Sequence, residues 1–186
     1  MKLADLMPKG LLSDELDAIA LLEADHDKLL ALFDQFEDIK QSHAHQEKQA
    51  IVADACHALT VHMAVEEGVF YPAVRGAVED DDLMNEALVE HDGAQSLIRD
   101  LERMDAGDEM FNAKFTVLAE SVRHHVKEER GEMFPKVRAT TIDLRALGRK
   151  MTARREELMK RNGSATPQSR PARRKHQAKG ESRAAR

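Results

Sequence analysis

An internal repeat limits how this chain can fold. The segment His62-Met63-Ala64-Val65-Glu66 recurs in outline as His125-Val126-Lys127-Glu128-Glu129, and each copy is followed by a proline six residues after its glutamate, Pro72 and Pro135. Residues four apart lie on one face of a helix, one turn from each other, so each His-x-x-x-Glu pair can reach a common point. Because proline cannot continue the hydrogen bonding of a helix, we predict that both helices end near these prolines.

A further histidine in acidic company precedes each pair. These are Asp25-His26-Asp27, whose histidine lies 36 residues before His62, and Glu90-His91-Asp92, whose histidine lies 34 residues before His125. The chain therefore carries the same order twice: a histidine, about 35 residues, then His-x-x-x-Glu.

Apolar residues recur at spacings of three and four in four long segments, which is typical of amphipathic helices. We predict helices at about 13–40, at about 46–71, from the acidic run at 79–82 to the turn at 105–108, and at about 109–134. Aromatic residues make up only 4% of the chain and Trp is absent, which disfavours β-sheet.

Four amphipathic helices with short connections fold most economically as an all-α, up-down-up-down four-helix bundle. A shorter amphipathic segment at about 140–160 predicts an additional C-terminal helix on the outside. We expect one domain over residues 1–160, with the bundle core at about 13–138, followed by a disordered basic tail at 161–186.

Charge divides the chain in the same way. Residues 161–186 contain eight Lys or Arg and one Glu, for a net +7, whereas the whole chain carries −6. A basic tail can contact nucleic acid or another acidic surface nonspecifically, or serve only solubility. Because no aromatic residue interleaves these charges, specific nucleic-acid recognition is not favoured.

The remaining bulk features suit a cytoplasmic protein. No apolar run approaches the ~20 residues that a transmembrane helix requires. The first residues lack the apolar core of a secretion signal, and the single cysteine, Cys56, cannot form an internal disulfide. We therefore expect a cytoplasmic location and no transmembrane segment.

The repeated histidines and glutamates fall on the apolar stripes, where burial is costly unless something compensates them. Taken singly, an inward histidine is more often a hydrogen-bonded core residue, and a His-x-x-x-Glu pair is more often a surface ion pair. Their joint occurrence favours a metal site. The overlapping pair His124 and Glu128 competes with His125 and Glu129, but His125 has the same spacing to its proline as His62. We therefore expect His124 to lie outside the ligand set.

With these motifs in place, the chain resembles the hemerythrin-like family, the HHE cation-binding domain, over roughly residues 13–138. The resemblance implies a four-helix bundle around a non-haem di-iron centre. It also implies four terminal iron ligands and two bridging carboxylates, which are His26, His62, His91 and His125, and Glu66 and Glu129. Nitrogen and oxygen ligands without a thiolate suit two iron ions, with manganese or zinc as alternatives.

The chain also departs from the family's pattern. Oxygen-carrying hemerythrins have another histidine one turn after the third-helix ligand, where this chain has Gln95. Glu67, beside one expected bridging carboxylate, corresponds to Arg130 beside the other; an exposed charge, an extra ligand and a proton relay are its alternative roles. For Tyr71 we expect packing near the helix end.

Three functions fit this ligand set. The resemblance favours binding or sensing of iron, dioxygen, nitric oxide or redox state over dioxygen transport. The alternatives are a di-iron enzyme acting on peroxide or nitric oxide, and iron storage or a structural metal site. The sequence shows no dedicated general acid beside the expected ligands, so an enzyme is the less favoured reading.

Overall fold

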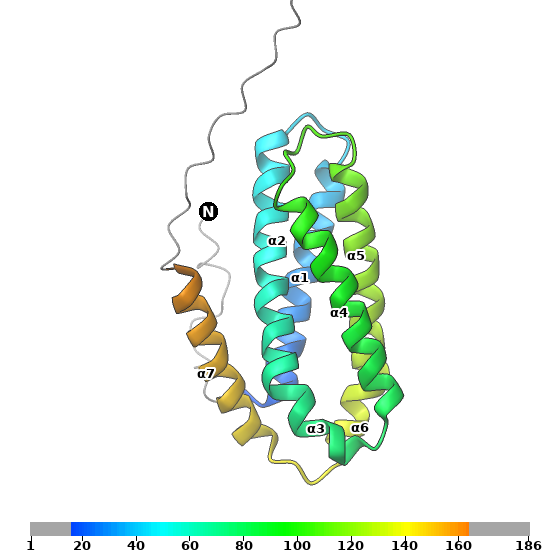
Figure 1. Cartoon of the computed structure of the whole chain (residues 1–186), viewed down its shortest axis with the longest axis vertical. Helices are drawn as coiled ribbons and strands as arrows, with labels where there is room; N and C mark the ends of the chain where they lie inside the picture. The colour runs from blue at the N-terminus through cyan, green and yellow to red at the C-terminus, as the bar shows by residue number, and fades with distance from the viewer. Residues whose placement is uncertain (1–15, 164–186) are drawn as a thin grey trace, which may run out of the picture.

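Four long helices run antiparallel along one another (Figure 1). The structure, a computed structural model, describes residues 16–163. The four helices are α1 (Ala18–Ile39), α2 (His45–Val65), α4 (Asp81–Leu101) and α5 (Phe111–Glu128). The predicted all-α bundle is confirmed, and none of the helices in the described part of the chain is long and apolar enough to span a membrane.

The first helix starts later than the sequence suggested. Asp17 is its N-cap, and its side chain accepts a hydrogen bond from the backbone N–H of Ala20 at 2.8 Å. This bond satisfies one of the N–H groups that the first turn leaves without a helical partner. The predicted start at residue 13 lies outside the described residues.

The helices do not end at the two prolines, and this part of the prediction was wrong. A five-residue π-helical turn follows α2 at Glu66–Phe70 and another follows α5 at Glu129–Met133. The chain then continues as α3 (Tyr71–Val78) and α6 (Phe134–Arg138), each with its proline in the first turn. A proline is tolerated there because the first N–H groups of a helix need no helical acceptor.

The predicted additional helix is α7 (Leu144–Gly163), which packs against α1 and α2. Its side chains Leu147 and Met151 are buried. Because α7 extends to Gly163, the first residues assigned to the basic tail are helical; residues 164–186 lie outside the described residues, and the division into a domain and a tail stays a prediction.

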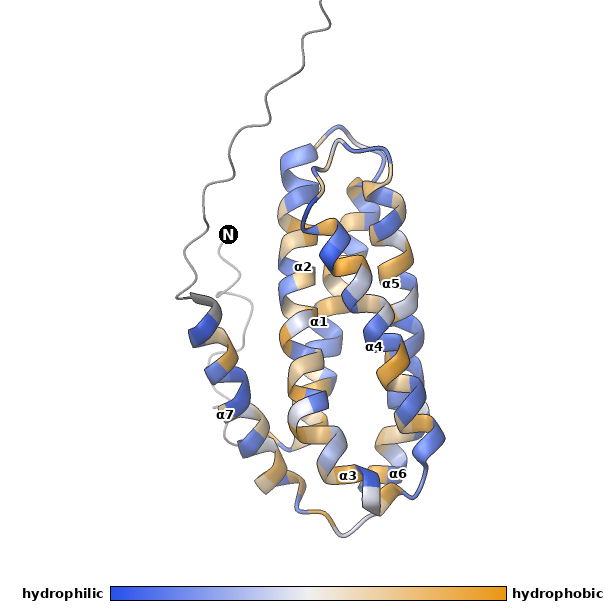
Figure 2. Ribbon diagram, viewed as in Figure 1, coloured by the Kyte–Doolittle hydropathy of each residue, from blue (hydrophilic) through white to orange (hydrophobic). Residues whose placement is uncertain are grey.

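Two apolar clusters fill the bundle, and the apolar residues line the helices on their inner sides (Figure 2). In α1 one cluster contains Ala18–Leu22 and the other contains Leu29–Phe36, with His26 between them. α4 has the same order, with Met84 and Ala87 before His91 and with Ala94, Ile98 and Leu101 after it, whereas α2 and α5 begin in the cluster that contains Leu29 and Phe36. The layer between the clusters holds buried ionisable side chains, which are His26, His62, Glu66, His91, His125 and Glu129.

Candidate metal centre

The structure brings together all six side chains that the sequence singled out. Their potential ligand atoms form two groups that share Glu66, and within each group these atoms lie within 4.8 Å of one another. The groups are His26, His62, Glu66 and Glu129, and Glu66, His91 and His125. Each of the six residues is at most 6% exposed. Each long helix contributes one histidine, and each π-helical turn begins at one of the two glutamates.

The first group joins α1 to α2 and to the turn after α5. Nε2 of His26 lies 3.1 Å from Oε2 of Glu129, and Nε2 of His62 lies 3.2 Å from Oε2 of Glu66. The two imidazole rings meet edge to face, with centroids 4.9 Å apart. The ring of Phe134 stacks on that of His26, with centroids 5.8 Å apart.

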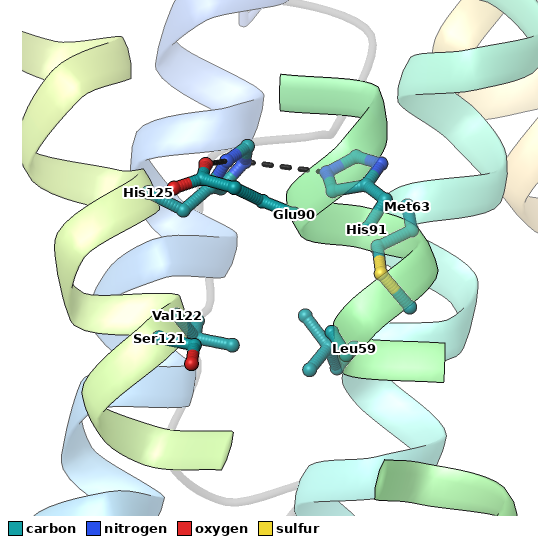
Figure 3. Close-up of a pocket in the computed structure, with 8 residues that line it drawn as sticks. Leu59, Met63, Glu90, His91, Ser121, Val122 and His125 are labelled. Atoms are coloured by element: carbon teal, nitrogen blue, oxygen red, sulfur yellow. Dashed lines mark hydrogen bonds and ion pairs between the residues drawn. The ribbon is translucent and has the colours of Figure 1, made fainter. Parts of the chain in front are cut away.

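The second group joins α4 to α5. His91 and His125 face each other, with 3.2 Å between their Nε2 atoms (Figure 3). Nε2 of His91 also lies 3.5 Å from Oε2 of Glu66, and Nε2 of His125 lies 3.5 Å from Oε2 of Glu129. A cavity of about 10 Å³ adjoins the two rings, and its wall includes the apolar side chain of Met63.

The distances between the nitrogen and oxygen atoms of these six side chains suit ligands of shared metal ions better than hydrogen bonds. Several of the buried nitrogen and oxygen atoms find no hydrogen-bond partner among the described residues: Nε2 of His26, both ring nitrogens of His62, both carboxylate oxygens of Glu66, and Oε2 of Glu129. Two ligands at about 2.1 Å from one cation and at right angles lie about 3 Å apart, close to the observed separations. Orphaned buried polar atoms are destabilising by themselves, and a cation satisfies them.

The pKa values of the two buried carboxyl groups are shifted in opposite directions. Burial raises the pKa of Glu66 well above its usual range, and the negative charge of Glu129 raises it further. Burial disfavours the charge of Glu129 as well, but the close imidazoles of His26 and His125 hold its pKa at about 2. Burial therefore favours the protonated form of Glu66, whereas the imidazoles favour the ionised form of Glu129.

The outer ring nitrogens also have partners. Nδ1 of His91 is 2.9 Å from Glu67, and Nδ1 of His125 is 2.8 Å from Glu90. A carboxylate at this position fixes the orientation of a ligand histidine and increases its basicity. The interpretation of Glu67 as an exposed charge is thus incomplete, because this side chain is partly buried and contacts Nδ1 of His91.

Two residues near the centre have contacts that spacing alone did not reveal. Tyr71 is buried near the helix end, as expected, and its hydroxyl donates to Oε1 of Glu129 at 2.9 Å. Gln95 donates to Oε1 of Glu67 at 3.3 Å. In the other copy of the repeat, Phe134 matches Tyr71 and Leu30 matches Gln95. The available signal in the sequence was therefore a polar residue in one copy where the other copy has an apolar one.

His124 lies outside the buried layer. Its imidazole is 59% exposed and is 3.2 Å from Oε1 of Glu128 on the helix surface. The spacing to the proline therefore separated the buried pair, His125 and Glu129, from the exposed one.

Comparisons with known proteins agree with this arrangement. The sequence profile of the Hemerythrin HHE cation binding domain matches residues 17–137, which is more than half of the chain. The fold is similar to the crystal structure of a Hemerythrin HHE cation binding domain-containing protein from Mycobacterium kansasii, with a TM-score of 0.64, 22% identity, and coverage of 81% of this chain and 95% of that chain. No curated protein matches the chain. The matched residues span all four long helices and all six buried ligand candidates, and the chain belongs to the hemerythrin HHE cation-binding domain family.

Proposed function

We propose that the buried layer holds two iron ions and that the protein binds or senses a small ligand such as dioxygen, nitric oxide or peroxide. The observation that carries the proposal is the set of buried nitrogen and oxygen atoms that face one another without hydrogen bonds. In the proposed site, His26 and His62 hold one ion, His91 and His125 hold the other, and Glu66 and Glu129 bridge them.

The ligand types favour iron. Imidazole and carboxylate ligands suit iron and manganese, with zinc as a further candidate, whereas copper(I) prefers thiolate or thioether ligands. Bound iron supplies reversible one-electron chemistry and open positions for an exogenous ligand. The chain's own contribution is to orient the imidazoles through Glu67 and Glu90 and to exclude bulk water with the two apolar clusters.

A small ligand suits the surroundings of the site. The cavity beside His91 and His125 has room for about one water-sized molecule, and its wall is mainly apolar. Ionisable side chains beside it are engaged with the histidines, which leaves no dedicated general acid among the described residues that line the cavity. Binding or sensing is therefore favoured over turnover, and Gln95 in place of a further histidine argues against dioxygen transport.

Metal content tests the first part of the proposal. Protein expressed in iron-replete medium should carry about two iron atoms per chain and show near-ultraviolet ligand-to-iron absorption. His125→Gln should lose metal and absorption, whereas the matched surface variant His124→Gln should keep both. A colourless protein that holds two zinc ions would contradict the assignment of iron.

Reactivity tests the second part. The iron-loaded protein is reduced without oxygen and then exposed separately to dioxygen, nitric oxide and peroxide. A stable adduct or a single reversible oxidation supports binding or sensing. Repeated turnover of peroxide or nitric oxide would instead make the protein an enzyme, and indifference to all three would favour storage or a structural metal.

A further inference from the structure

The four histidines of the centre are not supported alike. Each turns Nε2 toward the paired carboxylates and Nδ1 toward a residue further out. When Nε2 of a neutral imidazole binds a cation, the ring carries its hydrogen on Nδ1, and that N–H needs an acceptor. The residue facing Nδ1 therefore helps to decide how well each histidine can bind metal.

Three of the four Nδ1 atoms face a carboxylate. These contacts are His91 to Glu67 at 2.9 Å, His125 to Glu90 at 2.8 Å, and His62 to Asp25 at 3.5 Å. The longest of them belongs to the half of the centre that contains His26, and its carboxylate also pairs with Arg155 of α7. The half with His91 and His125 has two short contacts to carboxylates.

Nδ1 of His26 faces a donor instead. Nε of Arg130 approaches it at 3.4 Å, while the guanidinium also donates to the backbone oxygen of Glu23 at 2.8 Å and to Asp27 at 2.7 Å. Arginine stays charged and has no acceptor atom. For His26 to bind a cation through Nε2, two N–H groups must face each other or Arg130 must turn away from its contacts. The guanidinium charge also repels a cation at this end.

The two charged residues that face Nδ1 of His91 and Nδ1 of His26 occupy matching positions of the internal repeat. Arg130 follows Glu129 just as Glu67 follows Glu66. On the basis of the metal centre proposed above, we propose that its two cation positions bind metal with unequal affinity. The position between His91 and His125 fills first, and the position between His26 and His62 fills second, with an affinity limited by Arg130. The chain can then hold one cation, or two different ones, at intermediate metal supply.

Titration of the metal-free full chain with Co²⁺ tests this order. Calorimetry should resolve two steps, the first at least about tenfold tighter, a difference in the range that outer partners of metal ligands produce. Arg130→Gln should tighten the second step about tenfold and leave the first unchanged. Glu67→Gln should weaken the first step instead.

Proton NMR identifies the occupied half. Cobalt shifts the N–H signals of bound imidazoles, so one equivalent should give two shifted exchangeable signals that persist in His26→Gln and change in His91→Gln. Shifted signals that vanish in His26→Gln at one equivalent would reverse the order and overturn the proposal.

Arg123→Gln is the matched control. Arg123 lies in α5 and pairs with Asp34 at 2.7 Å, as Arg130 pairs with Asp27, but its contacts, Asp34 and the ring of Phe33, are not among the six ligand candidates. This variant should titrate like the unaltered chain. Two binding steps of equal affinity, or equal effects of Arg130→Gln and Arg123→Gln, would overturn the proposed inequality but not the proposed function. Uptake of fewer than two Co²⁺ would overturn the proposed function together with it.

Discussion

The hydroxyl of Tyr71 donates a hydrogen bond to Oε1 of Glu129 at 2.9 Å, although 58 residues separate them in the chain. The bond links the segment after α2 to the π-helical turn after α5. Burial raises the pKa of Tyr71 well above its usual range, and the negative charge of Glu129 raises it further. The phenol therefore stays protonated and acts as a fixed donor to a buried carboxylate.

Tyr71→Phe should weaken metal binding while preserving the bundle, because Phe occupies the matching position of the repeat, Phe134. The affinity for iron(II) should fall about tenfold, as for other lost partners of metal ligands. Metal-free protein should lose about 1–2 kcal/mol of unfolding free energy, because Oε1 of Glu129 loses its donor. Chelator competition and urea unfolding measure the two effects, and an unaltered affinity would show that this bond does not support the centre.

The two bridging candidates should respond differently to the same substitution. Glu66→Gln resembles the protonated carboxyl, the form that burial favours at this position, so the stability of the metal-free protein should change little. Glu129→Gln removes an ionised group and should cost about 3 kcal/mol, because His26 and His125 lose a buried charge partner. Both variants should lose the dinuclear site. Retention of two metals by both would disprove the bridging assignment.

Acid should destabilise the metal-free protein most steeply between about pH 4.5 and 3. Burial and the neighbouring His125 lower the pKa of His91 from 6.5 to about 3, and the pKa of Glu129 falls from 4.5 to about 2. In this window the unfolded chain binds more protons than the folded chain at both groups, so stability falls as pH falls. Glu66, whose pKa is raised, acts with the opposite sign only above pH 4.5. Urea unfolding across pH 3–5 should show a shallower dependence in His91→Gln; an identical slope would argue against this assignment.

Alanine substitutions of two helical glycines should change the stability of the protein in opposite directions. A Cβ on Gly148 of α7 would lie 2.6 Å from the backbone oxygen of Leu16, whereas one on Gly93 of α4 meets nothing within 4 Å. Gly148→Ala should therefore destabilise the protein by about 1–2 kcal/mol, because backbone cannot move aside cheaply. Gly93→Ala should stabilise it by up to about 1 kcal/mol through helix propensity. Thermal unfolding of both variants checks the close contact of α7, and equal shifts would contradict it.

Much of the fold and the identity of the six clustered side chains could be predicted from the sequence by itself. The spacing of apolar residues specifies helical faces, and four such faces must be buried against one another. The doubled His-x-x-x-Glu with its proline separated His125 from His124, because spacing along a helix determines which side chains share a face. The face on which a side chain lies is a property of a single helix, so it can be predicted from the sequence.

Only the tertiary structure decided what surrounds those side chains. The two π-helical turns, the hydroxyl of Tyr71 on Glu129, and the opposite partners of His91 and His26 depend on how helices distant in sequence approach one another. A sequence pattern places a charge such as Arg130 on a helix but does not say which neighbouring group it meets. The repeat thus specified a nearly symmetrical set of ligand candidates, and packing between helices made its two halves unequal.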